Sequence, residues 1–271
     1  MSDIFQNKIE KINEKAFDFL SQSTATYAQA ENLLISALDM QNFTPPSKNV
    51  SIKTLTESFV STGRLDSEYY QEKYKQYENK LCTNDVLNNI CKLYNKNFTP
   101  GEKQEYKYIE LSNIGSSGNI TDASLDIGEL LPTRARRIVK KGQVIVSSIE
   151  GSLSSCALVT DEYDGALCST GFYVVSSKEI NSETLLVLFK SKPIQELLKQ
   201  RCSGTILTAI SKEEFLNLPF PVINNETQSQ IATLIQSSFT LRKESENLLE
   251  TAKRAIEIAI EQDEDKAMEM L

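Results

Sequence analysis

Hydrophobic residues recur at helical spacing at both ends of the chain, whereas short apolar runs separated by turn residues fill the middle. Residues 3–40 contain no Pro or Gly, and their apolar and small residues recur at alternating steps of three and four. This heptad pattern predicts a long helix. Residues 226–262 show the same design. Residues 106–175 instead carry short apolar runs between Gly, Ser, Asn and Asp, which is typical of strands and turns.

The two helical segments carry seams in the same register, offset by 222 positions. The first seam consists of Ile9, Ile12, Ala16, Phe19, Ser23, Thr26, Ala30, Leu33 and Ala37, and the second of Ile231, Leu234, Ser238, Leu241, Ser245, Leu248, Ala252, Ala255 and Ala259. Small residues let helices approach closely, so we expect a repeated helix and an antiparallel coiled coil. The alternatives are a chance likeness of two amphipathic helices, or helices that each pack on the central module.

The residues around the β-rich stretch predict a smaller set of elements. Before the β-rich stretch, we expect a strand or sheet edge at 51–58, a Gly turn and Tyr-rich helix at 61–81, and a short helix and Asn/Lys-rich loop at 81–100. After it, we expect a helix at 182–203 that breaks at Pro193, and a short helix at 212–218. The predicted fold class is α+β: one β-rich domain flanked by two long helices. The predicted domains are 1–42, 43–224 and 225–271.

Charge is unevenly distributed along the chain, whose net charge is −8. Residues 1–42 hold 3 Lys/Arg and 6 Asp/Glu, and residues 225–271 hold 5 and 10, whereas residues 43–224 hold 21 of each. The acidity therefore belongs to the helices. A neutral central module can still bind DNA if its basic groups gather on one face, because phosphate contact is a local electrostatic effect.

Composition excludes several kinds of chemistry. The chain has no His, which excludes His-based acid–base catalysis, Ser-His-Asp triads and His metal sites. The five Cys form no CxxC pair, so we expect free thiols in the cytoplasm and no zinc site. No nucleotide-binding glycine motif, adenine-methyltransferase tetrapeptide or nuclease motif occurs, so we expect no catalytic residue and no cofactor. Neither a signal peptide nor an apolar run long enough to span a membrane is present.

The most suggestive local feature is a basic cluster just before the predicted strand QVIVSS. It consists of Arg134, Arg136, Arg137, Lys140 and Lys141. Such a cluster is suited to phosphate contact, and Arg also reaches guanine edges; the alternative is a solvated basic turn. Two loops of small residues, EGSLSS at 150–155 and SGTILTAI at 203–210, would let a DNA backbone approach closely or serve as ordinary turns. The acidic residues of EYDG, 162–165, fit a solvated turn.

Three stretches together resemble a known family. They are YIELSNIGSSGNITD, LPTRARRIVKKGQVIVSSIEGSLSSCALVTDEYDGALCSTGFYVV, and LLVLFKSKPIQELLKQRCSGTILTAISKEEFLNLPFPVINNETQSQI. In this order they resemble the specificity subunits of type I restriction-modification systems, over a full target-recognition domain and into the following helix. STGRLDSEYYQEKY, 61–74, resembles the segment that opens such a domain.

The resemblance implies a subunit without catalysis that reads double-stranded DNA. In that family, one chain carries two recognition domains, each reading half of a bipartite target, and positions adenine methyltransferase (modification) subunits and a restriction/translocase subunit. This chain has one such domain, so it resembles a half-length subunit that pairs with itself or with another half. A symmetric pair predicts a palindromic target. The start at Met1 favours a natural half-subunit over a fragment.

Combining the resemblance with charge gives ten candidate DNA-binding residues. The phosphate anchors are Lys96, Arg134, Arg136, Arg137 and Lys140, and the base readers are Asn113, Ser116, Ser152, Ser154 and Thr205. Two other functions compete with DNA recognition. A coiled-coil scaffold that binds only protein would explain the acidic helices but not the module, and it predicts no DNA binding. A self-contained DNA-modifying enzyme predicts activity with S-adenosylmethionine or a divalent metal in the absence of partners.

Overall fold

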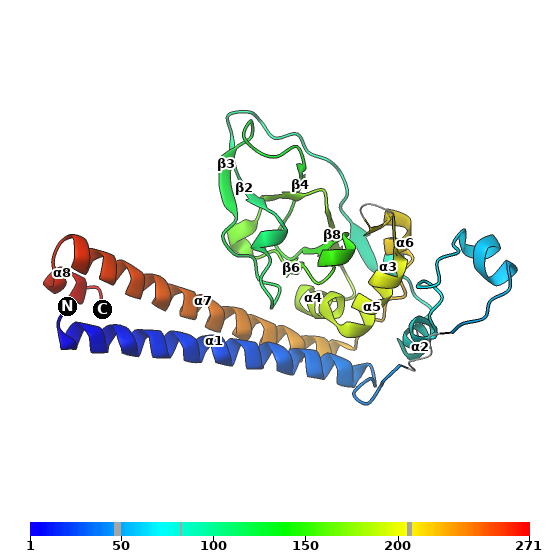
Figure 1. Cartoon of the computed structure of the whole chain (residues 1–271), viewed down its shortest axis with the longest axis horizontal. Coiled ribbons are helices and arrows are strands. Elements are labelled where there is room, and N and C mark those ends of the chain that lie inside the picture. The colour runs from blue at the N-terminus through cyan, green and yellow to red at the C-terminus, as the bar shows by residue number, and fades with distance from the viewer. Residues whose placement is uncertain (46–49, 82, 205–207) are drawn as a thin grey trace. The chain divides into compact units, whose positions relative to one another are not determined.

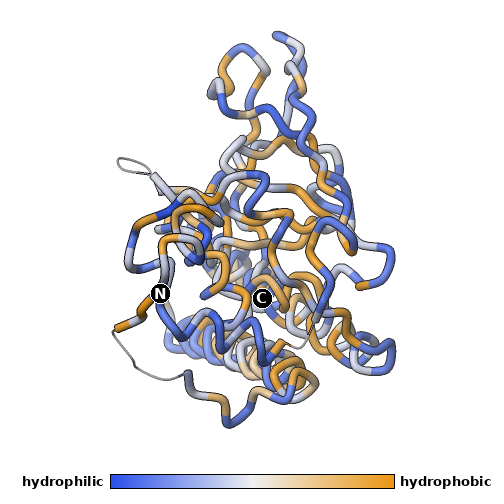
Figure 2. The backbone as a smooth tube through the Cα atoms, turned by 90° about the vertical axis from the view of Figure 1, so that its right-hand side faces the viewer, coloured by the Kyte–Doolittle hydropathy of each residue, from blue (hydrophilic) through white to orange (hydrophobic). Residues whose placement is uncertain are grey.

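The computed structural model describes residues 1–45, 50–81, 83–204 and 208–271. Their contacts divide them into a helical unit, Met1–Ala30 with Gln230–Leu271, and a β-rich unit, Glu31–Ser229. Along the backbone of both units, hydrophobic and hydrophilic residues alternate in short runs (Figure 2). The chain is therefore built from amphipathic elements, as its sequence pattern predicts.

The helices and strands follow one another as shown in Figure 1. The helices are α1 (Asp3–Ala37), α2 (Glu72–Leu81), α3 (Leu87–Ile90), α4 (Ser182–Lys190), α5 (Lys192–Arg201), α6 (Lys212–Leu216), α7 (Asn225–Glu261) and α8 (Glu264–Met268). The strands are β1 (Cys91–Leu93), β2 (Glu105–Ile109), β3 (Ser124–Ile127), β4 (Ala135–Ile138), β5 (Val144–Ser147), β6 (Cys156–Leu158), β7 (Leu167–Ser169), β8 (Phe172–Ser177), β9 (Cys202–Ser203) and β10 (Ala209–Ile210).

In the helical unit, α1 and α7 pack antiparallel through small residues. The Ser23 hydroxyl donates to the Ser238 carbonyl, and the Ser238 hydroxyl donates to the Ser23 carbonyl, both over 2.8 Å. Further along, the Ser245 hydroxyl donates to the Ala16 carbonyl over 2.7 Å. The buried seam residues include Ile9, Ala16, Ser23, Ala30, Ile231, Ser238, Ser245, Ala252 and Ala255. The predicted antiparallel pairing of the two long helices is confirmed, and the buried hydroxyls of Ser23, Ser238 and Ser245 each have a partner.

The ends of the long helices have local causes. Helix α1 ends at Ala37, three residues before the predicted end, and Asp39 follows with φ of 53°. Asp tolerates this left-handed conformation, which commonly terminates helices. Helix α7 begins at Asn225, where the side chain of Asn224 accepts a hydrogen bond from the Thr227 amide over 2.9 Å. That bond is an N-cap.

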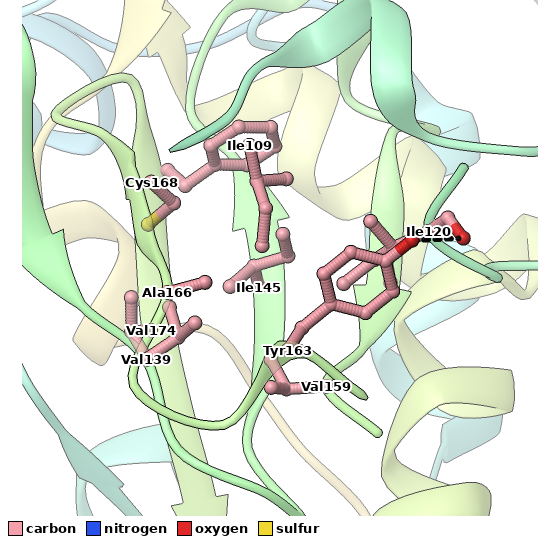
Figure 3. Packing of buried hydrophobic residues seen from close by; sticks show 11 residues of the cluster. Ile109, Ile120, Val139, Ile145, Val159, Tyr163, Ala166, Cys168 and Val174 are labelled. Carbon is pink, nitrogen blue, oxygen red and sulfur yellow. Dashed lines mark hydrogen bonds between the residues drawn. The ribbon is translucent and has the colours of Figure 1, made fainter. Parts of the chain in front are cut away.

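The described part of the β-rich unit contains two four-stranded sheets and a two-stranded sheet of β9 and β10. One four-stranded sheet is fully antiparallel with strand order β1-β8-β5-β6. The other has order β3-β2-β7-β4 and contains one parallel pair, β2 with β7. Residues of both four-stranded sheets share one hydrophobic core, in which Ile109 and Cys168 meet Ile145 and Val174 (Figure 3). The hydroxyl of Tyr163 reaches this core and donates to the Ile120 carbonyl over 3.3 Å.

Helix α4 packs on β5, β6 and β8 of the antiparallel sheet, and α5 packs on α4. Residues 184–189 of α4 are all buried, and the Phe189 ring lies 5.1 Å from that of Phe220 and 5.9 Å from that of Phe215. The break predicted at Pro193 is confirmed, because Pro193 lies in the first turn of α5. A missing amide hydrogen is tolerated in that turn.

One sequence prediction on the approach to the sheets is wrong, and another is incomplete. Instead of a strand at 51–58, Thr56–Val60 forms a π-helical turn with no buried residue. The Glu57 carboxylate accepts from the Thr54 amide over 3.0 Å, a local bond that competes with strand formation. Strand β1, in contrast, lies where only a short helix and a loop were expected, and its pairing with β8 is a long-range contact.

Candidate nucleic-acid interface

Strand β4 separates the members of the basic cluster, because alternate residues of a strand face opposite sides. Arg137 is only 9% exposed, and its guanidinium donates to the Phe172 carbonyl. The guanidinium carbon lies 5.8 Å from the centre of the Tyr173 ring. Burial lowers the pKa of Arg137. This side chain faces inward, so we correct its predicted role as a phosphate anchor to a structural one.

Two other members of the cluster have partners within the protein. Arg134 is exposed, donates to the Tyr108 hydroxyl over 3.1 Å and forms a 2.9 Å ion pair with Glu110. These contacts, with the bond to Tyr108 first, raise the pKa of Arg134. Lys141 forms a 2.7 Å ion pair with Asp161. Their charges are thus partly neutralised in the free protein.

Arg136 and Lys140 keep their charges available. Arg136 donates to the Thr133 carbonyl over 2.9 Å, and its positive charge has no counterion among the residues that the structure describes. Lys140 is exposed, and its amide nitrogen donates to the side chain of Gln143 over 2.8 Å. Gly142, with φ of 79°, makes the turn in which Lys140 stands, a conformation that favours glycine.

Lys140 lines a cleft of about 920 Å³ that we call the lysine cleft. Its lining residues are Leu93, Tyr94, Asn95, Lys96, Asn97, Phe98, Ile138, Lys140, Gln143 and Lys212. The three lysines come from the segment after β1, the turn between β4 and β5, and the first residue of α6. Within the described ranges, none of the three forms an ion pair. Such a cleft concentrates positive potential.

The segment 94–98 is held at both ends, by a different sheet at each end. The Tyr94 amide donates to the Val174 carbonyl of β8 over 2.8 Å, and the Phe98 amide donates to the Arg136 carbonyl of β4 over 2.6 Å. The Phe98 ring also meets the Tyr106 ring edge-on at 5.9 Å. The cleft wall therefore bridges the two sheets and has a defined backbone course.

The four described base readers lie in two connections, Asn113 and Ser116 between β2 and β3, and Ser152 and Ser154 between β5 and β6. Asn113 uses both ends of its amide: its oxygen accepts from the Glu110 amide and its nitrogen donates to the Asp122 carbonyl, each over 2.9 Å. Ser152 is bonded to the Ser147 hydroxyl over 2.8 Å. Both side chains therefore stabilise their own loops in the free protein.

The three remaining predicted base readers are Ser116, Ser154 and Thr205. Ser116 and Ser154 are exposed, and the Ser154 carbonyl accepts from the side chain of Lys190 over 3.0 Å. Thr205 lies outside the described residues. Of the ten predicted residues, the lysine cleft brings together Lys96 and Lys140; the remaining described ones do not line it.

Comparison with known proteins decides what this fold is. The family model of the type I restriction modification DNA specificity domain matches residues 47–251. The chain belongs to this family. The specificity domain thus covers the lysine cleft, all ten predicted residues and much of α7. No curated protein matches the chain.

Solved structures similar to this specificity domain come from the same type of system. One, from a study of complex assembly and conformational transition of the type I R-M system, is 26% identical over 64% of this chain, with a TM-score of 0.51. The type I restriction-modification S subunit from M. genitalium is 12% identical over 93% of this chain, with a TM-score of 0.52. The HsdS subunit from Thermoanaerobacter tengcongensis is 24% identical over 65% of this chain, with a TM-score of 0.48.

The chain spans 46% to 58% of the length of these solved chains.

As far as the described residues go, no helix is long and apolar enough to cross a membrane, and no group of His, Cys, Asp and Glu side chains is arranged to hold a metal ion. In the specificity domain, the four described cysteines are buried and free.

The sequence predicted two residues of the lysine cleft, Lys96 and Lys140, and missed its eight other lining residues. The repeated Asn and Lys of YNKNF, 94–98, was a local signal, because amides and amines are typical of nucleic-acid contacts. Lys212 gave no such signal. It reaches the cleft only because α6 folds back beside segments more than 60 residues away in the sequence.

Proposed function

We propose that this chain is the DNA sequence-recognition subunit of a type I restriction-modification complex and works in the cytoplasm. In this proposal it reads one half of a bipartite target and positions methyltransferase and motor-nuclease subunits, without a catalytic centre of its own. The family match supports DNA recognition. Because the chain spans about half of its solved relatives, we propose that it pairs with a second copy or with another half-subunit.

The lysine cleft is the proposed DNA contact surface, and it is the observation that carries the proposal. Three lysines without ion pairs inside the described part of the chain meet amide side chains and two aromatic rings. Lysines supply phosphate contact, and amides can read base edges. Arg136 adjoins the cleft through the bond from Phe98 to its carbonyl. Lys96, Lys140, Lys212 and Arg136 are therefore the proposed anchors, and Ser116 and Ser154 remain proposed readers.

The salt dependence of DNA binding tests this surface. The double variant Lys96→Ala/Lys140→Ala removes two cleft charges. The slope of the logarithm of the binding constant against the logarithm of the salt concentration should then be smaller in magnitude by about 1.8. The matched control is Lys107→Ala with Lys141→Ala, because those lysines already pair with Glu162 and Asp161. Titration of labelled duplex DNA at several salt concentrations measures both. Equal slopes for the wild type and the cleft variant would exclude the lysine cleft.

A further inference from the structure

The amide of Asn95 is distinguished from the other amides near the lysine cleft by its hydrogen bonding. Asn95 lines the cleft, and its Oδ1 is shielded from solvent and accepts no hydrogen bond from any residue that the structure describes. The oxygen of Gln143, in contrast, accepts from the Lys140 amide. A shielded acceptor without a donor costs free energy, which a donor brought by a ligand would recover.

Among the described residues, Asn119 has the other buried amide oxygen without a hydrogen bond, and its surroundings differ. Asn119 is buried and packs so closely on Gly115 that a Cβ built there would lie 2.2 Å from its Oδ1. It does not line the lysine cleft. Asn95 is half-buried, and the terminal torsion of an Asn side chain is soft. DNA recognition by this amide would require it to turn toward the open side of the cleft.

The backbone around Asn95 is held in place. The preceding residue, Tyr94, is fixed by the bond from its amide to the Val174 carbonyl and by a 3.2 Å bond between its hydroxyl and that of Ser176. On the other side, the Phe98 amide is bonded to β4. A side chain on a fixed backbone is suited to specific recognition, because little ordering is needed on binding.

Base chemistry indicates which ligand satisfies this amide. In the major groove, adenine presents N6 as a donor beside N7 as an acceptor, cytosine presents only the N4 donor, and guanine presents two acceptors at N7 and O6. An Asn amide matches adenine at both atoms: Oδ1 accepts from N6 and Nδ2 donates to N7. We propose that Asn95 is a specificity-determining residue that reads an adenine, while Lys96, Lys140 and Lys212 hold the flanking phosphates. This inference rests on the proposed DNA-recognition function.

The test begins with the wild-type chain, assembled with its partner subunits and selected against a pool of duplex DNA with randomised positions. Asn95→Ala should relax the preference for adenine at one position of the selected motif by roughly 5- to 150-fold, with the salt slope unchanged. Asn95→Asp keeps the acceptor but loses the donor, so that position should shift toward cytosine. The control is Asn89→Ala, an exposed amide of α3 that does not line the cleft.

A modified base sharpens the test. In a duplex with 7-deazaadenine at that position, the N7 acceptor is missing, so the wild type should bind less tightly than to adenine, whereas Asn95→Ala should bind both alike. Asn95→Asp is nearly the same size as Asn, so it provides the readout if Asn95→Ala does not fold. An unchanged motif for both Asn95 variants, together with the lowered salt slope of the Lys96 and Lys140 variant, would overturn the inference and leave the proposed function intact. Absence of DNA binding by the assembled wild type would overturn both.

Discussion

At the scale of single residues, burial decides what each cation of the basic cluster does. Arg136 and Arg137 are neighbours in the sequence, yet Arg137 is turned toward the Phe172 carbonyl and the Tyr173 ring, whereas the charge of Arg136 has no counterion among the described residues. Desolvation lowers the pKa of Arg137, and the Cys168 and Tyr173 groups act in the opposite direction. Two adjacent arginines thus have different surroundings, because strand residues alternate between faces.

Substitution of these two arginines should separate folding from DNA binding. Arg137→Ala should lower the free energy of unfolding by roughly 2–4 kcal/mol, because it leaves a cavity and an unpaired carbonyl. Arg137→Met fills most of the volume, so it should cost less and leave the salt slope of DNA binding unchanged. Arg136→Ala should barely affect unfolding but lower that slope by about 0.9. Urea unfolding measures the free energy of unfolding, and salt titration measures the slope of DNA binding. A lowered slope for Arg137→Met would show that Arg137 contacts phosphate after all.

The buried thiols predict how stability depends on pH. Burial raises the pKa of Cys91, Cys156, Cys168 and Cys202 from 9.0 to about 12. Between these values the unfolded chain has lost protons that the folded chain retains, so the free energy of unfolding should fall as pH rises from 9 to 12 and be unaffected by these groups below 9. Raised pKa values of Tyr69, Tyr74, Tyr77 and Tyr173 act in the same direction.

Urea unfolding at a series of pH values measures this dependence, and alkylation provides a second readout. At pH 8 the four thiols should resist iodoacetamide in the folded protein and react after unfolding, because the thiolate is the nucleophile. Peptide mass mapping distinguishes the four sites. Rapid alkylation of any of them in the folded state, or stability that rises between pH 9 and 12, would contradict the assigned burial.

At the scale of elements, close approach is the common device of both units. In the helical unit, serine and alanine let α1 and α7 come near enough for hydroxyls to bond to carbonyls of the facing helix. In the β-rich unit, Gly118 brings its loop against α4 and accepts a hydrogen bond from the Leu158 amide over 3.0 Å. Both contacts exclude larger side chains, because the space they would need is already occupied.

Gly118→Ala tests the second of these contacts. Gly118 has φ of +78°, and an added Cβ would lie 2.7 Å from the side chain of Leu186. Both effects oppose folding, so we expect a loss of about 2 kcal/mol or more in the free energy of unfolding. The matched control is Gly151→Ala, where a Cβ meets no atom within 4 Å and the change should stay within about 1 kcal/mol. Urea titration followed by tyrosine fluorescence compares the two; equal losses would contradict the steric explanation.

At the scale of the whole molecule, the chain holds one β-rich unit. In the sequence, this unit lies between the two segments of the helical unit, Met1–Ala30 and Gln230–Leu271. The match covers only 46% and 58% of two relatives of known structure. Since one recognition domain reads one half-site in the proposed function, a complete target requires a second domain. Two identical chains related by a twofold axis would read two identical half-sites in opposite directions.

A methylation map distinguishes the forms of pairing. The chain is co-expressed with its modification subunit in a host without DNA methylation, and genomic N6-methyladenine is sequenced. A gapped palindromic motif is expected for a pair of identical chains, and a gapped asymmetric motif would show pairing with a different half. Absence of methylation by a complex whose subunits are soluble and associated would contradict the proposed function and favour a protein-binding scaffold.

The sequence by itself determined the elements whose causes are local. Heptad spacing without Pro or Gly predicted both long helices and their antiparallel pairing, and Pro193 predicted the break between α4 and α5. Lys96 and Lys140 could be chosen as anchors because a cation in a polar loop is visible in the sequence. Such features depend on backbone preference and on residues a few positions apart, which a local pattern records.

Only the tertiary structure decided which charges remain available and where they meet. Arg137 is turned into the interior, Arg134 is bonded to Glu110, and Lys212 reaches the lysine cleft from a helix far along the chain. Strand β1 exists because it pairs with β8, more than 80 residues away, whereas Thr56–Val60 forms a π-helical turn. These outcomes depend on contacts between distant segments, whose free energy no local pattern of residues contains.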